Sequence, residues 1–241
     1  MAHQKQRLDH YLAAAKLVAS RSQAASYIRL GKVTVNNKVV TKAGTMVSVT
    51  DAVEIKIDQQ YVSRAALKLA SVADLFKLDF AHKTVLDVGS STGGFTDFAL
   101  RHGATKVIAV ELGTDQLHPS LRDESRIELH EKTDIRNFKT TQAIDIVVAD
   151  VSFISLREIL PSVQALCTPQ TQLVIMVKPQ FEAGQSNLKH KGVIKNDKMR
   201  RDILKDFEDW AKSHFVILDK ADSDVAGSKG NRERFYLLQV L

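Results

Sequence analysis

The stretch TVLDVGSSTGGFTDFAL, residues 84–100, decides the fold of this chain. Its apolar, β-branched start over residues 84–88 predicts a buried strand, and Gly89, Gly93 and Gly94 predict a turn after it. A helix is expected to begin near Gly94. Such a strand, turn and helix can hold a ligand at the helix N-terminus, because glycine lets the backbone pass close to a bound group or adopt a positive φ.

Two common nucleotide-binding patterns fit this turn poorly. A Walker loop has Lys and then Ser or Thr after its last glycine, whereas Phe95 follows Gly94. The dinucleotide pattern has a glycine where Ser91 stands.

A second sign of a ligand site is Glu111, at the end of the next predicted strand, where a carboxylate can accept hydrogen bonds from two ribose hydroxyls. A purely structural turn and a solvent-exposed carboxylate are the alternative interpretations.

Apolar runs on both sides of this stretch extend the pattern. From residue 62 onward, helical segments alternate with short apolar strands, which is the signature of an α/β fold. We therefore predict a mostly parallel seven-stranded sheet in a domain of residues 61–241, after a linker at 58–61. The strands are expected at residues 84–88, 107–111, 127–130, 144–149, 173–177, 215–218 and 235–240.

Residues 1–60 predict a separate, small α+β domain. Gly31 closes a helical pattern, and Asn36 and Asn37 tolerate the positive φ of a tight hairpin. This segment holds nine Lys and Arg against four Asp and Glu, nearly all of the chain's net charge of +6, which favours a polyanionic partner such as nucleic acid. Helices are expected at residues 7–17 and 22–30, and strands at 32–35, 38–40 and 53–57.

The segment RLDHYLAAAKLVASRSQAASYIRLGKVTVNNKVV, residues 7–40, closely resembles the RNA-binding module named after the small-subunit ribosomal protein S-four. In that family the second helix and the turn after it present cations to RNA phosphates. A solvated helix face is the alternative interpretation of the same charges. The resemblance implies RNA binding by Arg7, Arg21, Arg29 and Lys32, with Ser22 and Gln23 as lesser candidates.

Other totals exclude several classes of protein. Cys167 is the only cysteine, so no intramolecular disulfide is possible, and we interpret it as a core residue rather than a catalytic thiol. The apolar runs, such as residues 173–177, are far shorter than the ~20 residues that span a bilayer. We expect a cytoplasmic protein with no bound metal and no membrane partner.

Four motifs carry a second resemblance, which covers essentially the whole chain. VSRAALKL (62–69), DVSFISL (150–156), VKPQFE (177–182) and GNRERF (230–235) resemble the FtsJ-type ribose methyltransferases and, more closely, the TlyA-type family once labelled haemolysins. The resemblance implies a class I, Rossmann-like methyltransferase fold and the cofactor S-adenosylmethionine. It also implies a catalytic tetrad of Lys68, Asp150, Lys178 and Glu233.

Each member of this tetrad also has an ordinary structural interpretation. Lys68 could be a surface cation, Asp150 a helix N-cap, Lys178 a loop cation and Glu233 a strand-end charge. Within the resemblance, Asp87 and the glycine turn hold the methionine end of the cofactor, and Asp134 contacts adenine. The residues expected at the cofactor are Asp87, Gly89, Ser90, Ser91, Gly93, Gly94, Phe95, Glu111, Asp134 and Asp150.

The expected reaction is methylation of a cytidine 2′-hydroxyl in ribosomal RNA, and the resemblance alone supplies the nucleotide. Lys178 is our candidate general base. An ordinary lysine is protonated near neutral pH, so this role requires surroundings that disfavour the ammonium form. In the family that the chain resembles, members of this shorter build act on large-subunit RNA and longer ones on both subunits, so the resemblance favours the large subunit. A membrane-lytic haemolysin and an RNA-binding protein without methyltransferase activity are the alternatives.

Overall fold

The computed structural model of the chain describes residues 5–18, 20–56, 61–183, 192–194, 196–225, 227 and 230–241. Most of the expected linker at 58–61, and the last residue of the strand expected at 53–57, lie outside the described residues.

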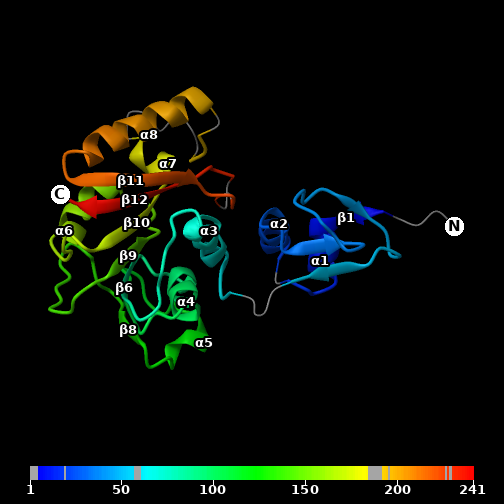
Figure 1. The fold of residues 1–241 in the computed structure, drawn as a ribbon, viewed down its shortest axis with the longest axis horizontal. Helices are drawn as coiled ribbons and strands as arrows, with labels where there is room; N and C mark the ends of the chain where they lie inside the picture. The colour runs from blue at the N-terminus through cyan, green and yellow to red at the C-terminus, as the bar shows by residue number, and fades with distance from the viewer. Residues whose placement is uncertain are drawn as a thin grey trace.

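A seven-stranded sheet forms the centre of the larger domain (Figure 1). Its order is β11-β12-β10-β9-β6-β7-β8, with β12 antiparallel to both of its neighbours and the remaining pairs parallel. The predicted mostly parallel, seven-stranded α/β fold is thereby confirmed. The strands are β6 Thr84–Val88, β7 Lys106–Val110, β8 Ile127–His130, β9 Ile146–Ala149, β10 Gln172–Val177, β11 Phe215–Asp222 and β12 Arg234–Val240.

Helices cover both faces of this sheet because the strands are apolar on both sides, as parallel strands require. Side chains of α6 and α8 pack with the strands into one buried cluster, and side chains of α3 and α4 pack on the opposite face. The helices of this domain are α3 Arg64–Ala73, α4 Gly94–Arg101, α5 Pro119–Arg122, α6 Leu156–Gln164, α7 Pro179–Glu182 and α8 Asp197–Ala211.

The small domain holds two helices and two short sheets. Asn36 and Asn37 have φ of 50° and 63°, which confirms the predicted hairpin turn. The first helix is shorter than expected, because it ends before Lys16, which has a φ of 56°. The elements are β1 Gln6–Arg7, α1 Leu8–Ala14, α2 Arg21–Arg29, β2 Val33–Val35, β3 Lys38–Val39, β4 Met46–Val47 and β5 Val53–Ile55, paired as β1-β4 and β3-β2-β5.

The two domains meet at α3. Leu67 on α3, and Val225 between β11 and β12, are buried in the same apolar cluster as Leu12, Tyr27 and other core residues of the small domain. Figure 1 shows the small domain, in blue, beside α3 and away from the C-terminus. The helix that follows the linker is therefore shared by the cores of both domains.

Candidate active site

A cavity of about 750 Å³ opens at the carboxyl ends of β6, β7, β9 and β10. Parallel strands end at one edge of the sheet, so the loops after them converge there, which is where open α/β sheets bind ligands. The residues that line the cavity include Asp87, Gly89, Ser90, Ser91, Phe95, Glu111, Asp134, Asp150, Ser152, Phe153 and Lys178.

The four expected catalytic residues form one continuous chain of charges at this edge. Lys178 Nζ lies 2.5 Å from Asp150 Oδ1, and Lys68 Nζ lies 3.8 Å from Asp150 Oδ2 and 2.6 Å from Glu233 Oε2. Lys178 and Glu233 are buried, and the side chains of Lys68 and Asp150 are only 12% and 15% exposed. Ion pairs this sheltered are screened little by solvent and fix their partners' positions.

The strand register explains why these four residues meet. Val177, the last residue of β10, pairs with Arg234, the first residue of β12. Lys178 and Glu233 come directly beyond this pair, so they lie on adjacent segments at the same edge of the sheet. Asp150 follows β9 directly, and Lys68 reaches the same edge from α3. Nothing in the local sequence around any one of them reveals this meeting, because it depends on the order of the strands.

Asp87 is the buried carboxylate of the cavity. Its Oδ2 accepts a hydrogen bond of 2.6 Å from Thr96 Oγ1, while Oδ1 has no hydrogen-bond partner among the described residues. The pKa of Asp87 is raised to about 7, chiefly by burial and also by the nearby carboxylates of Asp150 and Glu111, while the hydrogen bond from Thr96 opposes the rise. An acceptor this poorly satisfied, at the wall of a cavity, is suited to a cationic ligand group.

Glu111 and Asp134 line the other end of the cavity. Glu111 accepts backbone hydrogen bonds from Ser91 (2.9 Å) and Gly113 (2.7 Å), which tie the loop after β6 to the loop after β7. Each carboxylate oxygen still has lone pairs for a ligand hydroxyl. Asp134 is held by the guanidinium of Arg136, whose hydrogen bonds lower the pKa of this carboxyl.

The glycine turn takes the expected shape, with φ of 77° at Gly89 and 86° at Gly93, the residue that caps the N-terminus of α4. Gly89 lines the cavity, whereas Gly93 and Gly94 do not. A Cβ on Gly94 would lie 2.3 Å from Ser63 Oγ and 2.7 Å from Ala65 Cβ, so this glycine lets the start of α3 approach α4. Ligand contact by Gly93 and Gly94 stays a prediction.

Comparison with known proteins agrees with this geometry. Residues 61–240 match the FtsJ-like methyltransferase family, and residues 6–53 match the S4 domain. The chain belongs to the FtsJ-like methyltransferase family. The expected class I methyltransferase architecture is thereby confirmed.

Relatives of this FtsJ-like methyltransferase cover both of its domains. The 23S rRNA (cytidine-2′-O)-methyltransferase TlyA of Campylobacter jejuni is 40% identical over 191 residues, 78% of this chain and 74% of that protein. The 16S/23S rRNA (cytidine-2′-O)-methyltransferase TlyA of Mycobacterium tuberculosis is 36% identical over 241 residues, 97% of this chain and 90% of that protein. A candidate hemolysin from Streptococcus thermophilus has a solved structure with a TM-score of 0.72 and 32% identity, which covers 99% of this chain and 90% of that one.

Two residues at the site of this methyltransferase were missed from the sequence. Ser152 accepts a hydrogen bond of 2.7 Å from Lys178 Nζ. Phe153 lines the cavity with its side chain 90% exposed and a φ of 68°, and its ring lies 5.2 Å from that of Phe181. A positive φ is sterically costly for a bulky residue, and an exposed Phe leaves its apolar surface in water, so Phe153 is a candidate functional residue. The motif DVSFISL contains both residues, but its pattern does not distinguish an exposed Phe from a buried one.

The S4 domain presents most of its expected RNA-binding residues at the surface. Asp9 is buried and accepts two hydrogen bonds from Arg7, and Arg21 lies 3.6 Å from the same carboxylate. The hydrogen bonds from Arg7 and the charges of Arg7 and Arg21 lower the pKa of Asp9 against the effect of burial, so this carboxylate stays ionised and pairs with both guanidinium groups. The exposed members are Arg7, Arg21, Ser22, Arg29 and Lys32, whereas Gln23 is buried.

The remaining sequence expectations concern the thiol, metals and membranes. Cys167 packs against the core, and burial raises the pKa of its thiol to about 12, so it stays protonated and unreactive. Within the described ranges, no group of three or more His, Cys, Asp and Glu side chains is arranged to hold a metal ion. None of the described helices has the length and apolar character to cross a membrane.

Proposed function

We propose that this chain methylates a cytidine 2′-hydroxyl of ribosomal RNA with S-adenosylmethionine, residues 1–60 holding the RNA and residues 61–241 the cofactor. The observation that carries the proposal is the sheltered chain of ion pairs that joins Lys68, Asp150, Lys178 and Glu233. It lies beside a cavity in which one oxygen of Asp87 has no hydrogen-bond partner among the described residues. The two curated relatives are named as cytidine-2′-O-methyltransferases of ribosomal RNA, and the S4 domain supports an RNA substrate.

The cavity residues fit such a cofactor. The orphan oxygen of Asp87 can accept from an α-ammonium group, Glu111 can accept from ribose hydroxyls, and Asp134 can accept from an adenine amine. The volume of about 750 Å³ lies within the range of small-molecule sites. When bound, the sulfonium of S-adenosylmethionine supplies an electrophilic methyl group and one positive charge.

Lys178 is the group that takes the hydroxyl proton in this proposal. Asp150 lies between two ammonium groups and shares one negative charge with both, while Glu233 pairs with Lys68 at 2.6 Å. The tetrad is neutral as a whole when both lysines are protonated. To take the hydroxyl proton, Lys178 Nζ reacts as a neutral amine, whose lone pair accepts the proton. The carboxylates then orient the lysines, and positioning supplies much of the catalysis.

Phe153 supports a nucleotide substrate at the mouth of the same cavity. Bases removed from a helix stack on aromatic side chains, which supply a face without requiring a particular base. We propose that the exposed ring of Phe153, beside Phe181, stacks on the base whose ribose reaches Lys178.

A substrate nucleotide in ribosomal RNA implies a cytoplasmic enzyme. The relative that is named for 23S rRNA alone favours the large subunit.

Methyl transfer to purified ribosomal subunits tests the proposal. The protein is incubated with S-adenosylmethionine carrying a labelled methyl group and with each subunit from a strain that lacks the enzyme, and the product is mapped by mass spectrometry of RNA fragments. We expect one 2′-O-methylcytidine with the parental protein and with Lys212→Ala, which removes an exposed lysine, and none with Lys178→Ala.

The alternatives predict different results in the same experiment. A membrane-lytic protein would release dye from liposomes and leave RNA unmodified, and an RNA-binding protein without activity would bind subunits without label transfer. Methylation of a base or of protein instead of a ribose would contradict the proposed reaction while leaving the methyltransferase family intact.

A further inference from the structure

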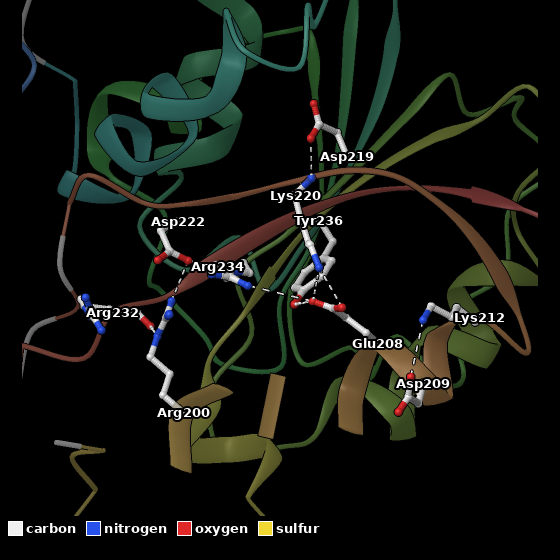
Figure 2. Close-up of polar contacts among 10 residues, drawn as sticks. All are labelled: Arg200, Glu208, Asp209, Lys212, Asp219, Lys220, Asp222, Arg232, Arg234 and Tyr236. Atoms are coloured by element: carbon white, nitrogen blue, oxygen red, sulfur yellow. Dashed lines mark hydrogen bonds and ion pairs between the residues drawn. The ribbon is translucent and has the colours of Figure 1, made fainter. Parts of the chain in front are cut away.

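A second polar cluster lies on the α8 face of the sheet, opposite the face on which Lys68 reaches the active site (Figure 2). It joins α8 to the end of β11 and the start of β12 through Arg200, Asp222 and Arg234. None of these side chains lines the cofactor cavity. Arg234, the first residue of β12, nevertheless follows Glu233 directly in the chain.

Arg200 is the buried centre of this cluster. It is only 5% exposed, its Nε donates a hydrogen bond of 3.0 Å to the backbone carbonyl of Arg232, and its Nη2 donates one of 2.7 Å to Asp222 Oδ1. A guanidinium is costly to bury unless its donors are satisfied and its charge is paired. The two bonds use the planar fork of arginine in two directions, which a lysine cannot reproduce.

Asp222 completes the link on the other side of Glu233. The same oxygen, Oδ1, accepts a hydrogen bond of 2.6 Å from Arg234 Nε, and Asp222 and Arg234 are register partners in the β11–β12 ladder. Burial raises the pKa of Asp222, but the hydrogen bonds from Arg234 and Arg200 outweigh it, so the pKa is lowered and the carboxylate stays ionised.

Glu233 therefore lies between two residues that one cluster fixes. Arg200 holds the carbonyl of Arg232, and Asp222 holds the side chain of Arg234. The backbone of Glu233 is held as well, since Ser223 N donates to its carbonyl at 3.0 Å. Successive side chains of an extended chain point to opposite faces, so fixing both neighbours on the α8 face directs Glu233 toward Lys68 on the α3 face.

We propose that Arg200 and Asp222 are positioning residues that hold Glu233 at its ion-pair distance from Lys68, an inference that rests on the catalytic role proposed above for Glu233. Small displacements of catalytic groups cost much of the rate, because the reacting atoms must be aligned closely. The cluster supplies that alignment from outside the cavity.

The first test substitutes Arg200→Lys, which keeps the positive charge but replaces the two separate donors, Nε to the Arg232 carbonyl and Nη2 to Asp222, with a single nitrogen. Lys212→Met is the matched control, because it breaks the 3.5 Å ion pair between two exposed residues, Lys212 and Asp209, at the opposite end of α8 from Arg200 (Figure 2). We expect the single-turnover rate of methyl transfer to fall about 10- to 100-fold in Arg200→Lys. The control should stay within about twofold of the parent, and cofactor affinity by calorimetry should be unchanged in both.

A double-mutant cycle separates positioning from a general effect on the fold. If Arg200 acts through Glu233, adding Arg200→Lys to Glu233→Gln should slow the reaction less than about twofold further, because the positioned group is already disabled. Rates that multiply in the double mutant would overturn the positioning role alone. A parental rate in Glu233→Gln would instead overturn the catalytic role of Glu233, and the positioning role with it.

All rates are measured below the unfolding midpoint of each variant. If Arg200→Lys does not fold, Asp222→Asn takes its place in the cycle, because an amide oxygen can still accept from both arginines without the charge. We expect a smaller loss of rate from it and the same non-additivity with Glu233→Gln. Full additivity there would count against the proposal in the same way.

Discussion

Cofactor affinity should depend on pH through Asp87. Its raised pKa of about 7 means that the carboxyl is mostly protonated at pH 6 and mostly ionised at pH 7.5. If a cofactor ammonium group contacts its unpaired oxygen, the complex requires the ionised form. Affinity for S-adenosylmethionine should then fall about eightfold between pH 7.5 and pH 6, on the order of 1.2 kcal/mol. The ligand's own α-amino group, with an ordinary pKa of ~7.7 to 8.0, begins to lose its proton near pH 7.5 and opposes the trend above it, so the titration stops there.

Calorimetric titration at pH 6, 6.5, 7 and 7.5 measures this slope, and buffers of different ionisation enthalpy report the proton released on binding. Asp87→Asn should bind weakly at every pH and show no slope. The variant should also be more stable than the parent above pH 7. Folded Asp87 holds its proton up to about pH 7, whereas an unfolded aspartate loses it near ~4, so stability falls as pH rises between these values. A flat affinity profile in the parent, or an unchanged slope in Asp87→Asn, would refute the reasoning.

Three further outcomes are expected. Lys178→Ala should lower the single-turnover methylation rate by about 10²- to 10⁴-fold with cofactor binding intact. Lys178→Arg should not restore the rate, because guanidinium stays protonated. A near-parental rate in the arginine variant would show that the residue acts by charge or position. Glu111→Ala should weaken cofactor binding by roughly 1 to 3 kcal/mol in calorimetry, and parental affinity in a folded variant would remove its assignment to the ribose. Charge reversal at Arg21 and Arg29 should weaken binding to ribosomal subunits and reduce its salt dependence, because binding with fewer phosphate contacts releases fewer counterions. An unchanged affinity and salt slope would remove these residues from the interface.

The sheet was predictable because its strands are buried on both faces. β6 starts and ends at the expected residues because its buried run lies between Lys83 and Gly89, and β8 does so although its apolar and polar residues alternate. The edge strand β11 extends to Asp222, four residues beyond the expected end at 218, because its exposed side chains hide the apolar pattern. Two-residue strands such as β1 and β4 are too short to leave any periodicity.

The candidate site was predictable only where a motif carried it. The resemblance gave Lys68 and Glu233, whose meeting across α3 and β12 no local pattern could supply. Arg200 was not expected at all, because on its own helix it is one cation among several, and its burial depends on the distant carbonyl of Arg232. Contacts between residues far apart in the chain, rather than the residues themselves, are what the sequence conceals.

The shared helix α3 has a further consequence for how the protein melts and how it can be shortened. Leu67 is buried with the core of the small domain, and the next residue, Lys68, stands in the active site. Removing residues 1–60 would expose Leu67 and Val225 to water and loosen the helix turn that carries the catalytic lysine. Calorimetric scanning of the full chain should therefore show one cooperative transition rather than two. The truncated chain should methylate slowly even on a short RNA that needs no anchoring.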